Sequence, residues 1–357
     1  MELSSLTIIL TDQCNFDCAY CYQKKGRQRL DSAVLMRSIR FFQPFFAREC
    51  FIDFYGGEPL LAFAEIRQTV EQIEGLSKKR GIKAHYSLTT NGSLLNDDIL
   101  NFLEGHEFSV LLSFDGLAQD TSRKKGSFDF LVSVIPKILE RPRISLETNS
   151  VFTSETIHHL SRSIELIDQM GVRKISVGFG HRRPWTSSSL LRQKKEIARV
   201  RKYFRSHCQK IEDVPWTDLG EQLEKAIYCC AAGQNKMALA ADGTLWGCFL
   251  FPQYFSGSKK IREAQKYCFG DVDTYIENHN EIYPQTMENY ATLRMDNFST
   301  PGGSCAICDE IEECWICPLA AALISRKIGR IPALVCGGAK MWRKEKRRLL
   351  EQFKKLN

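Results

Sequence analysis

Cys14-Asn15-Phe16-Asp17-Cys18-Ala19-Tyr20-Cys21 follows the first apolar segment of the chain, and its cysteines have the spacing C-x3-C-x2-C. Iron–sulfur clusters are held by cysteine thiolates, and a [4Fe–4S] cube has four irons to ligate. Three close thiolates leave one iron open to a further ligand, which a reactive cluster needs. A structural zinc site is the alternative, but zinc takes a fourth Cys or His, and this loop contains none.

Around this loop, short apolar runs alternate with helical patterns over roughly the first 180 residues, which predicts a parallel sheet covered by helices. The expected strands are Ser5–Leu10, Cys50–Tyr55, Ala84–Thr89, Ser109–Phe114, Ser145–Phe152 and Lys174–Phe179. The expected helices are Ala33–Ala47, Phe63–Arg80, Asn96–Glu104, Phe128–Glu140 and Thr156–Met170. Sheets of this kind carry their chemistry at the carboxyl ends of the strands.

Short polar motifs follow three more of these strands. Gly56-Gly57-Glu58-Pro59 comes after the second, Thr90-Asn91-Gly92 after the third, and Ser113-Phe114-Asp115-Gly116 at the end of the fourth. Together with the cysteine triad and the aromatic Tyr20 before its last cysteine, these motifs resemble the signature of the radical S-adenosylmethionine (SAM) enzymes. The resemblance implies a partial (β/α)6 TIM-like barrel.

It also implies a [4Fe–4S] cluster on Cys14, Cys18 and Cys21, and bound SAM whose reductive cleavage gives a 5′-deoxyadenosyl radical. By resemblance, the glycines let backbone approach the ligand, Glu58 receives the methionine ammonium and Ser113 contacts the nucleoside or carboxylate. Arg123 is a candidate partner of the methionine carboxylate. The expected cofactor-binding residues are Tyr20, Gly56, Gly57, Glu58, Pro59, Asn91, Ser113 and Arg123.

From Cys229 onward the segments become short, and glycine and cysteine become frequent. These short segments and this composition predict a region with little apolar core that is held together by metal. Its cysteine motifs are Cys230, then Gly243-x4-Cys248, then Cys305-x2-Cys308-x5-Cys314-x2-Cys317, and finally Cys336. Zinc ribbons are the alternative by spacing alone.

The cysteine order is similar to that of the SPASM extension of radical SAM enzymes, which carries two auxiliary [4Fe–4S] clusters. The resemblance assigns Cys230, Cys248 and Cys317 to the first, and Cys305, Cys308, Cys314 and Cys336 to the second. The usual quartet ends C-x3-C, whereas Cys314 and Cys317 are separated by two residues. The fourth ligand of the first cluster stays open between Cys229, Cys268 and an open iron. The expected domains are a barrel over residues 1–185, a helical linker over 186–228 and a small cysteine-rich SPASM domain over 229–357.

Composition and charge limit the cellular location and the partners that we expect for this chain. The chain has 357 residues, 14 cysteines and a formal net charge of +7. No secretory signal is visible, and no stretch approaches the roughly 18 apolar residues of a membrane span. We therefore expect a reducing, cytoplasmic location without membrane association, where clustered cysteines bind metal and Cys50 and Cys208 are inert buried thiols. Thiolate ligation would lower the apparent basic charge, so no nucleic-acid partner is predicted.

SPASM-bearing enzymes mostly modify peptides or proteins, so the leading prediction is maturation of a ribosomally made peptide by crosslinking (thioether or C–C) or epimerisation. An anaerobic sulfatase maturase is the runner-up, but such enzymes carry an Asp base directly after the G-x4-C cysteine, where this chain has Phe249. A non-catalytic iron–sulfur electron carrier and a zinc-binding module are alternatives from other classes.

The expected partners follow from the leading prediction. They are a precursor peptide or protein and a reductant such as flavodoxin or ferredoxin. With 13 residues before Cys14, an N-terminal leader-binding domain does not fit, so we expect binding elsewhere or a separate leader-binding protein. The basic stretch of residues 182–205 is a candidate site for an acidic leader.

Overall fold

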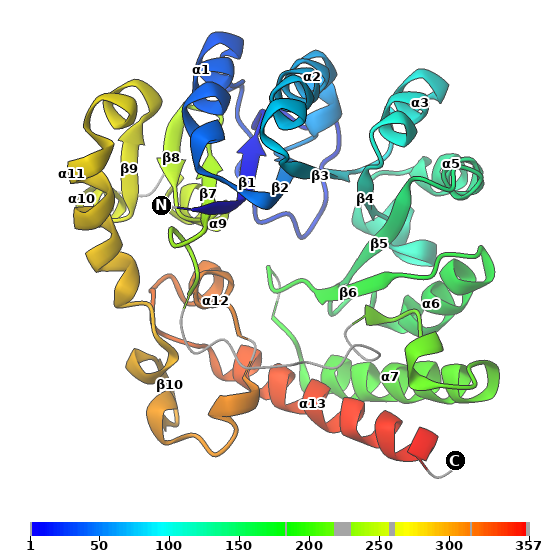
Figure 1. The fold of residues 1–357 in the computed structure, drawn as a ribbon. Coiled ribbons are helices and arrows are strands. Elements are labelled where there is room, and N and C mark those ends of the chain that lie inside the picture. Colours follow the sequence, from blue (N-terminus) through cyan, green and yellow to red (C-terminus); the bar gives the residue numbers. More distant parts are fainter. Residues whose placement is uncertain (1, 183, 218–229, 257–260, 315, 355–357) are drawn as a thin grey trace. The chain divides into compact units, whose positions relative to one another are not determined.

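The computed structural model describes residues 2–182, 184–217, 230–256, 261–314 and 316–354 (Figure 1). The chain forms two compact units, each assembled from segments that are distant in sequence. The first unit contains Met1–Asn15, Tyr22–Thr89 and Lys225–Ala333, and the second contains Phe16–Cys21, Thr90–Glu224 and Leu334–Asn357.

The strands of the first unit follow the order β3-β2-β1-β7-β8-β9. Neighbouring strands run parallel from β3 to β7, and the β7–β8 and β8–β9 pairs are antiparallel. The C-terminal region thus extends the sheet on the far side of β1. The strands are β1 (Leu3–Ile9), β2 (Phe46–Tyr55), β3 (Lys83–Thr90), β7 (Lys236–Leu239), β8 (Thr244–Trp246) and β9 (Cys268–Asp271).

Burial alternates along β2, because successive side chains of a strand point to opposite faces. Ile52 and Phe54 are buried, whereas Asp53 and Tyr55 are half-buried. The Asp53 carboxylate accepts hydrogen bonds from the hydroxyls of three residues on neighbouring strands, Ser5, Thr7 and Ser87. One face of this sheet is therefore apolar and the other is lined by polar groups.

Helices of the first unit begin and end at recognisable signals. Asp31 caps α1 (Ser32–Phe42) by accepting hydrogen bonds from the Ala33 and Val34 amides, and Asp271 caps α11 (Val272–Ala291) in the same way through Thr274. The other helices are α2 (Phe63–Arg80), α9 (Leu250–Phe255), α10 (Ile261–Gln265) and α12 (Pro318–Ser325). The 3₁₀ turns are η1 (Gln43–Phe45), η2 (Pro59–Ala62), η6 (Met295–Asn297), η7 (Cys305–Ile307) and η8 (Ile311–Glu313), and β10 (Ser299–Thr300) pairs with β11 (Gly303–Ser304).

The second unit has three parallel strands in the order β6-β5-β4. They are β4 (Ser109–Ser113), β5 (Ser145–Phe152) and β6 (Ile175–Phe179). The helices are α3 (Asp97–Gly105), α4 (Gln119–Ser122), α5 (Ser127–Leu139), α6 (Leu160–Gln169), α7 (Ser187–His207) and α13 (Ala333–Lys354). The 3₁₀ turns are η3 (Gly116–Ala118), η4 (Ile157–His159) and η5 (Ile211–Asp213).

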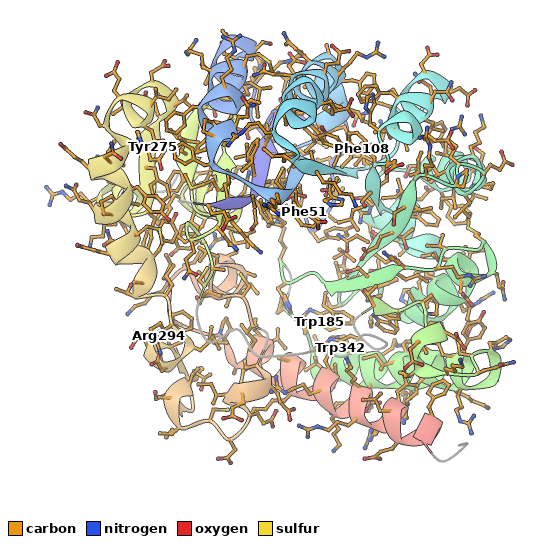
Figure 2. The ribbon with its side chains drawn as sticks, viewed as in Figure 1. Phe51, Phe108, Trp185, Tyr275, Arg294 and Trp342 are labelled. Carbon is orange, nitrogen blue, oxygen red and sulfur yellow. The ribbon has the colours of Figure 1, made fainter. Side chains whose placement is uncertain are left out.

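The C-terminal helix α13 packs within the second unit, against β6 and α7. The ring of Trp342 lies 5.4 Å from that of Phe179 and 5.0 Å from that of Trp216, between ring centroids. Glu345 pairs with Arg201 of α7 at 3.6 Å. Figure 2 shows Trp342 beside Trp185, whose ring packs edge-on against Phe179. In the described part of the chain, no helix is both long and apolar enough to cross a membrane.

All six predicted parallel strands are present as β1 to β6, so the alternation of strands and helices is confirmed. The first helix was predicted to reach Ala47, and this is wrong. The helix α1 ends at Phe42, and Phe46 already begins β2. Pro44 disfavours the α conformation of Gln43 and cannot donate a helical hydrogen bond, so a 3₁₀ turn replaces the last helical turn.

The expectation of little apolar core after Cys229 is also wrong. Aromatic rings pack closely there, with Phe269 and Tyr290 stacked at 5.7 Å and Phe251 edge-on to Tyr290 at 5.0 Å. The 20-residue helix α11 supplies Tyr275 and Tyr290 to this cluster. Periodicity faded in the sequence because the cluster draws single residues from several short elements, which leaves no long amphipathic pattern.

Candidate active site

The cysteine loop follows β1, and all three of its cysteines are half-buried. The amide of Cys21 donates to the carbonyl of Cys18 at 3.1 Å, which closes a tight turn between two of the predicted iron ligands. The amide of Ala19 donates to the carbonyl of Ser122 at 2.8 Å and anchors this turn to the second unit. Cys14 belongs to the first unit and lies four residues before Cys18 in the chain.

The Gly56-Gly57-Glu58 motif lies against the backbone that precedes Cys14. The amide of Gly57 donates to the carbonyl of Thr11 at 2.7 Å, and the amide of Glu58 donates to the carbonyl of Gln13 at 2.8 Å. A Cβ atom added at Gly56 would lie 2.5 Å from the Thr11 oxygen, and one at Gly57 would lie 2.2 Å from the Gln13 oxygen. Only glycine fits this approach, so the glycine motif and the start of the cysteine loop form one backbone assembly.

Glu58 and Pro59 continue this assembly into η2. The Glu58 carboxylate is fully buried and accepts a hydrogen bond from the Leu60 amide at 3.1 Å, so it caps the turn that Pro59 begins. A carboxylate is costly to bury unless hydrogen-bond donors or cations compensate its charge. Binding of a ligand ammonium by Glu58 stays a prediction.

Asn91 and Ser113 lie at the carboxyl ends of β3 and β4. Asn91 is buried, and its side-chain oxygen accepts hydrogen bonds from the amide and hydroxyl of Ser93, at 3.0 and 2.6 Å. Ser113 is half-buried and lies opposite Asn149 in the β4–β5 register. Both residues are positioned by strand ends, where parallel sheets carry their chemistry.

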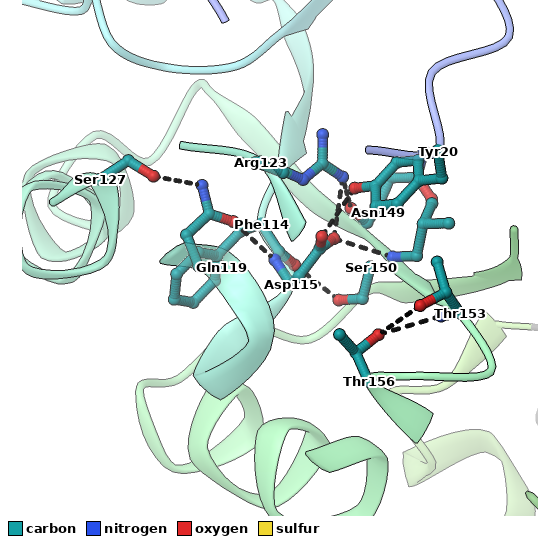
Figure 3. Close-up of polar contacts among 11 residues, drawn as sticks. Tyr20, Phe114, Asp115, Gln119, Arg123, Ser127, Asn149, Ser150, Thr153 and Thr156 are labelled. Atoms are coloured by element: carbon teal, nitrogen blue, oxygen red, sulfur yellow. Dashed lines mark hydrogen bonds and ion pairs between the residues drawn. The ribbon is translucent and has the colours of Figure 1, made fainter. Parts of the chain in front are cut away.

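Tyr20, Asp115 and Arg123 form a buried cluster, which we call the tyrosine clamp (Figure 3). The Tyr20 hydroxyl donates to one Asp115 carboxylate oxygen at 2.6 Å, and Arg123 pairs with the other at 2.9 Å. The Arg123 guanidinium also lies over the Tyr20 ring, 5.3 Å from its centroid. The clamp therefore joins the aromatic residue of the cysteine loop to the end of β4.

Asp115 is fully buried, and further donors surround it. The Val151 amide donates to its carboxylate at 2.8 Å, and Arg123 also donates to the Asn149 carbonyl at 3.0 Å. Burial lowers the pKa of Arg123, but the Asp115 carboxylate, Tyr20 and Cys18 together outweigh burial, so the pKa is raised overall. The positive charge of Arg123 is already compensated by Asp115 inside the protein. Pairing of Arg123 with a cofactor carboxylate therefore stays a prediction.

Three aromatic residues of the first unit connect the ends of β1, β2 and β8. The hydroxyls of Tyr22 and Tyr55 share a hydrogen bond of 2.6 Å. The Tyr55 ring lies 4.9 Å from the ring of Phe249, between centroids. The residue that follows Cys248 is thus half-buried against a second aromatic ring, and it offers no proton-accepting group.

Cys230, Cys248 and Cys317 lie close together, although 87 residues separate the first from the last in the sequence. Burial, and to a smaller extent the negative charges of Cys317 and Cys230, raise the pKa of the Cys248 thiol to about 12. Half-buried thiols that repel one another when ionised suit a cationic iron–sulfur centre, which stabilises thiolates. These donors fit the first auxiliary cluster, whose ligand set stays a prediction.

The cysteines predicted to bind the second auxiliary cluster lie on or next to η7, η8 and α13. Cys305 and Cys314 are buried, and the Cys308 amide donates to the Cys305 carbonyl at 3.1 Å in η7. Cys336 lies on α13 in the second unit, and Cys229 lies outside the described residues. Among the described residues, no three His, Cys, Asp or Glu side chains converge as ligands of one metal ion.

Asp115 is the site residue that the sequence did not single out by itself. It was visible only as the third residue of the Ser113–Gly116 motif, eight positions before Arg123. No helical or strand period links those positions, because a 3₁₀ turn and the short helix α4 intervene. The partners of Asp115 could therefore be identified only from the folded structure.

Comparison with known proteins identifies the part of the chain that contains the cysteine triad and the strand-end motifs. Residues 8–167 match the Radical SAM superfamily. The chain is 24% identical over 183 residues to the radical SAM cyclopropyl synthase TigE of Paramaledivibacter caminithermalis, covering 46% of this chain and 38% of that protein. It is 27% identical over 187 residues to the cysteine-type anaerobic sulfatase-maturating enzyme of Clostridium novyi, covering 48% and 50%. The chain therefore spans half or less of the length of these two relatives.

The fold comparison extends over nearly the whole chain. The structure of native anSMEcpe with bound AdoMet and Cp18Cys peptide matches with a TM-score of 0.71 and 19% identity, covering 99% of both chains. This similarity confirms the predicted partial barrel followed by a cysteine-rich region. The Radical SAM match covers the cysteine triad and the strand-end motifs. Residues 8–167, which carry the cysteine triad and the strand-end motifs, form a domain of the Radical SAM superfamily.

Proposed function

We propose that this enzyme matures a ribosomally made peptide, forming a thioether or C–C crosslink or epimerising a residue after hydrogen abstraction. The proposal rests on the Radical SAM match of residues 8–167, and the half-buried thiols of Cys230, Cys248 and Cys317 suit an auxiliary cluster. When bound, the cluster on Cys14, Cys18 and Cys21 would supply the electron that cleaves SAM. An auxiliary cluster would accept the second electron that crosslinking releases.

The chain's own residues hold and position the reactants. Backbone of the glycine motif lies next to the start of the cysteine loop, and Glu58 is the candidate acceptor of the methionine ammonium. The tyrosine clamp fixes the part of the loop between Cys18 and Cys21. Such rigid support matters because a reacting carbon must be held close to the radical for hydrogen transfer.

Formylglycine formation, the sulfatase-maturase activity, is the second candidate because of the similarity to the Clostridium novyi enzyme. The residue after Cys248 argues against it. Phe249 packs against Tyr55 and cannot act as a general base. A sulfatase-derived peptide carrying Cys or Ser tests this candidate directly, since formylglycine production would replace our proposal.

The test is anaerobic co-expression with each short open reading frame found beside this gene, followed by mass spectrometry of the peptides. A crosslink lowers the peptide mass by two hydrogens, and epimerisation in D2O raises it by one deuterium without any other change. Cys14→Ala should abolish both the product and 5′-deoxyadenosine, whereas Cys208→Ala should retain them. An electron carrier would give no 5′-deoxyadenosine from the intact protein, and a zinc module would contain zinc without iron.

A further inference from the structure

The basic charge of this protein is concentrated on two helices of the second unit. α7 contains seven basic and one acidic residue, and α13 contains seven basic and two acidic residues. These helices therefore carry a net charge of +11, whereas the whole chain carries +7. The remaining residues are net acidic, at −4, so the positive charge is a local feature of α7 and α13.

Two of the three acidic residues of these helices, Glu196 and Glu345, are turned away from solvent, and Glu351 is exposed. Glu196 is buried, accepts a hydrogen bond from the Ser161 hydroxyl at 2.6 Å and pairs with Arg199 at 2.6 Å. Glu345 is buried between Arg201 and Arg348. The solvent-facing charge is thus more positive than the composition of the helices indicates.

Exposed cations on α7 form one stripe. Arg192, Lys195, Arg199 and Lys202 are all exposed, and they follow one another at intervals of three and four residues. Residues at this spacing share one face of a helix. The Arg199 side chain is 66% exposed, so its guanidinium reaches solvent even though it contacts Glu196.

This stripe ends in a shallow hollow of about 420 Å³ between α6 and α7, which we call the α6–α7 groove. It is lined by Arg162, Glu165, Arg199, Lys202, Tyr203 and two serines. Three cations face a single carboxylate there. The groove therefore matches a chain of carboxylates better than an apolar or cationic ligand.

We propose that the α6–α7 groove and the α7 stripe bind an acidic segment of the peptide substrate. This inference rests on the proposed function. Electrostatic complementarity of this kind mainly raises the association rate and fixes the register of a bound chain. A segment held on α7 would keep the peptide associated while its reacting residue enters the active site.

Other anionic partners fit the surface less well. Single-stranded nucleic acid needs exposed aromatic faces for base stacking, but Tyr203 stacks on His207 and donates its hydroxyl to Asp168 at 2.8 Å. An anionic membrane needs apolar side chains next to the cations. On α7, Ile197, Val200 and Phe204 are fully buried in the second unit, and Leu191 is the large apolar side chain of this helix that is exposed, too little for membrane insertion.

The test uses the full-length, cluster-loaded enzyme and a fluorescein-labelled (Glu-Ala)6 peptide, with (Gln-Ala)6 as the uncharged control. We expect fluorescence anisotropy to show binding of the acidic peptide that weakens as salt approaches about 0.15 M, because the Debye length falls to about 8 Å. The triple variant Arg162→Gln, Arg199→Gln, Lys202→Gln should bind about tenfold more weakly or worse.

The matched control removes three exposed cations elsewhere, by Arg40→Gln, Lys83→Gln and Lys137→Gln. Equal weakening by both triple variants would overturn the proposal, since it would show a non-specific charge effect. Tighter binding of oligo-dT than of the peptide, lost in the groove variant, would also overturn it. Formation of 5′-deoxyadenosine is measured separately, so failure of the proposed function is detected there and leaves the anisotropy result intact.

Discussion

At the residue scale, the tyrosine clamp brings an ion pair and a phenol together around one fully buried carboxylate. Asp115 satisfies a buried guanidinium, a phenol and a backbone amide at once, while all of them are shielded from water. Burying an ion pair contributes little stability compared with an apolar pair, but breaking one leaves an uncompensated charge. The clamp therefore favours one position of the cysteine loop, because any other position would separate these groups.

Replacement of Asp115 tests this reasoning. Asp115→Ala should lower the free energy of unfolding by about 3–5 kcal/mol, because Arg123 stays buried without its partner. The double variant Asp115→Leu, Arg123→Met should recover most of that loss in urea unfolding. If the single and double variants are equally destabilised, packing rather than charge explains the effect.

The pH dependence of thiol alkylation tests a second residue. Burial, and to a smaller extent the carboxylates of Asp168 and Asp213, raise the pKa of Cys208 to about 11. The thiolate is the reactive form, so alkylation of Cys208 by iodoacetamide should increase about tenfold per pH unit from pH 8 to about 11. Peptide mass spectrometry measures the rate at this position, and a plateau near pH 9 would contradict the assignment.

At the element scale, the fit between the glycine motif and the cysteine loop decides the geometry of the site. The carbonyls of Thr11 and Gln13 occupy the space of two missing Cβ atoms. The end of β2 is therefore tied to the segment that carries Cys14 by backbone contacts alone. No side-chain substitution elsewhere can replace such a contact, because it depends on the absence of a side chain.

Gly57→Ala should disrupt this fit. Its Cβ would lie 2.2 Å from the Gln13 oxygen, so the backbone must shift. We expect formation of 5′-deoxyadenosine to fall at least tenfold, and the free energy of unfolding to fall by about 1–3 kcal/mol. Gly75→Ala is the control. It lies in α2 with open space around it and should stabilise the helix by about 0.5–1 kcal/mol. Full activity of Gly57→Ala would show that the motif is only a turn.

At the scale of the whole molecule, the C-terminal region combines an aromatic core with buried thiols. Tyr290 donates to the Tyr267 carbonyl at 2.6 Å and accepts from the Gly247 amide at 2.8 Å, directly before Cys248. The aromatic core and the thiol group therefore share the β8–α9 turn. Metal binding there would stabilise both, because ligands must be held in the folded arrangement.

Removal of iron by a chelator under anaerobic conditions should lower the thermal midpoint, and reconstitution with iron and sulfide should restore it. The aromatic core should keep the metal-free region partly folded, so we expect near-ultraviolet circular dichroism to decrease rather than vanish. Cys248→Ala should reduce bound iron by about four atoms per chain, the content of one cube. An unchanged iron content would exclude Cys248 as a ligand.

The sequence by itself determined the parallel strands, the strand-end motifs and the spacing of the cysteine triad. Each of these is local, because periodicity, glycine requirements and ligand spacing are properties of short stretches. The end of α1 was missed although Pro44 marks it, because the apolar pattern continues through Phe45 and Phe46 into β2. A pattern shared by two neighbouring elements hides the boundary between them.

Only the tertiary structure decided which distant groups meet. Asp115 reaches Tyr20 across 95 residues, Phe249 packs on Tyr55, and the basic helix α13 joins α7 through Glu345 and Arg201. Such contacts follow from the pairing of strands and the packing of helices, which no local pattern encodes. The physical reason is that burial and charge pairing are set by the whole surrounding shell of atoms, and that shell exists only after folding.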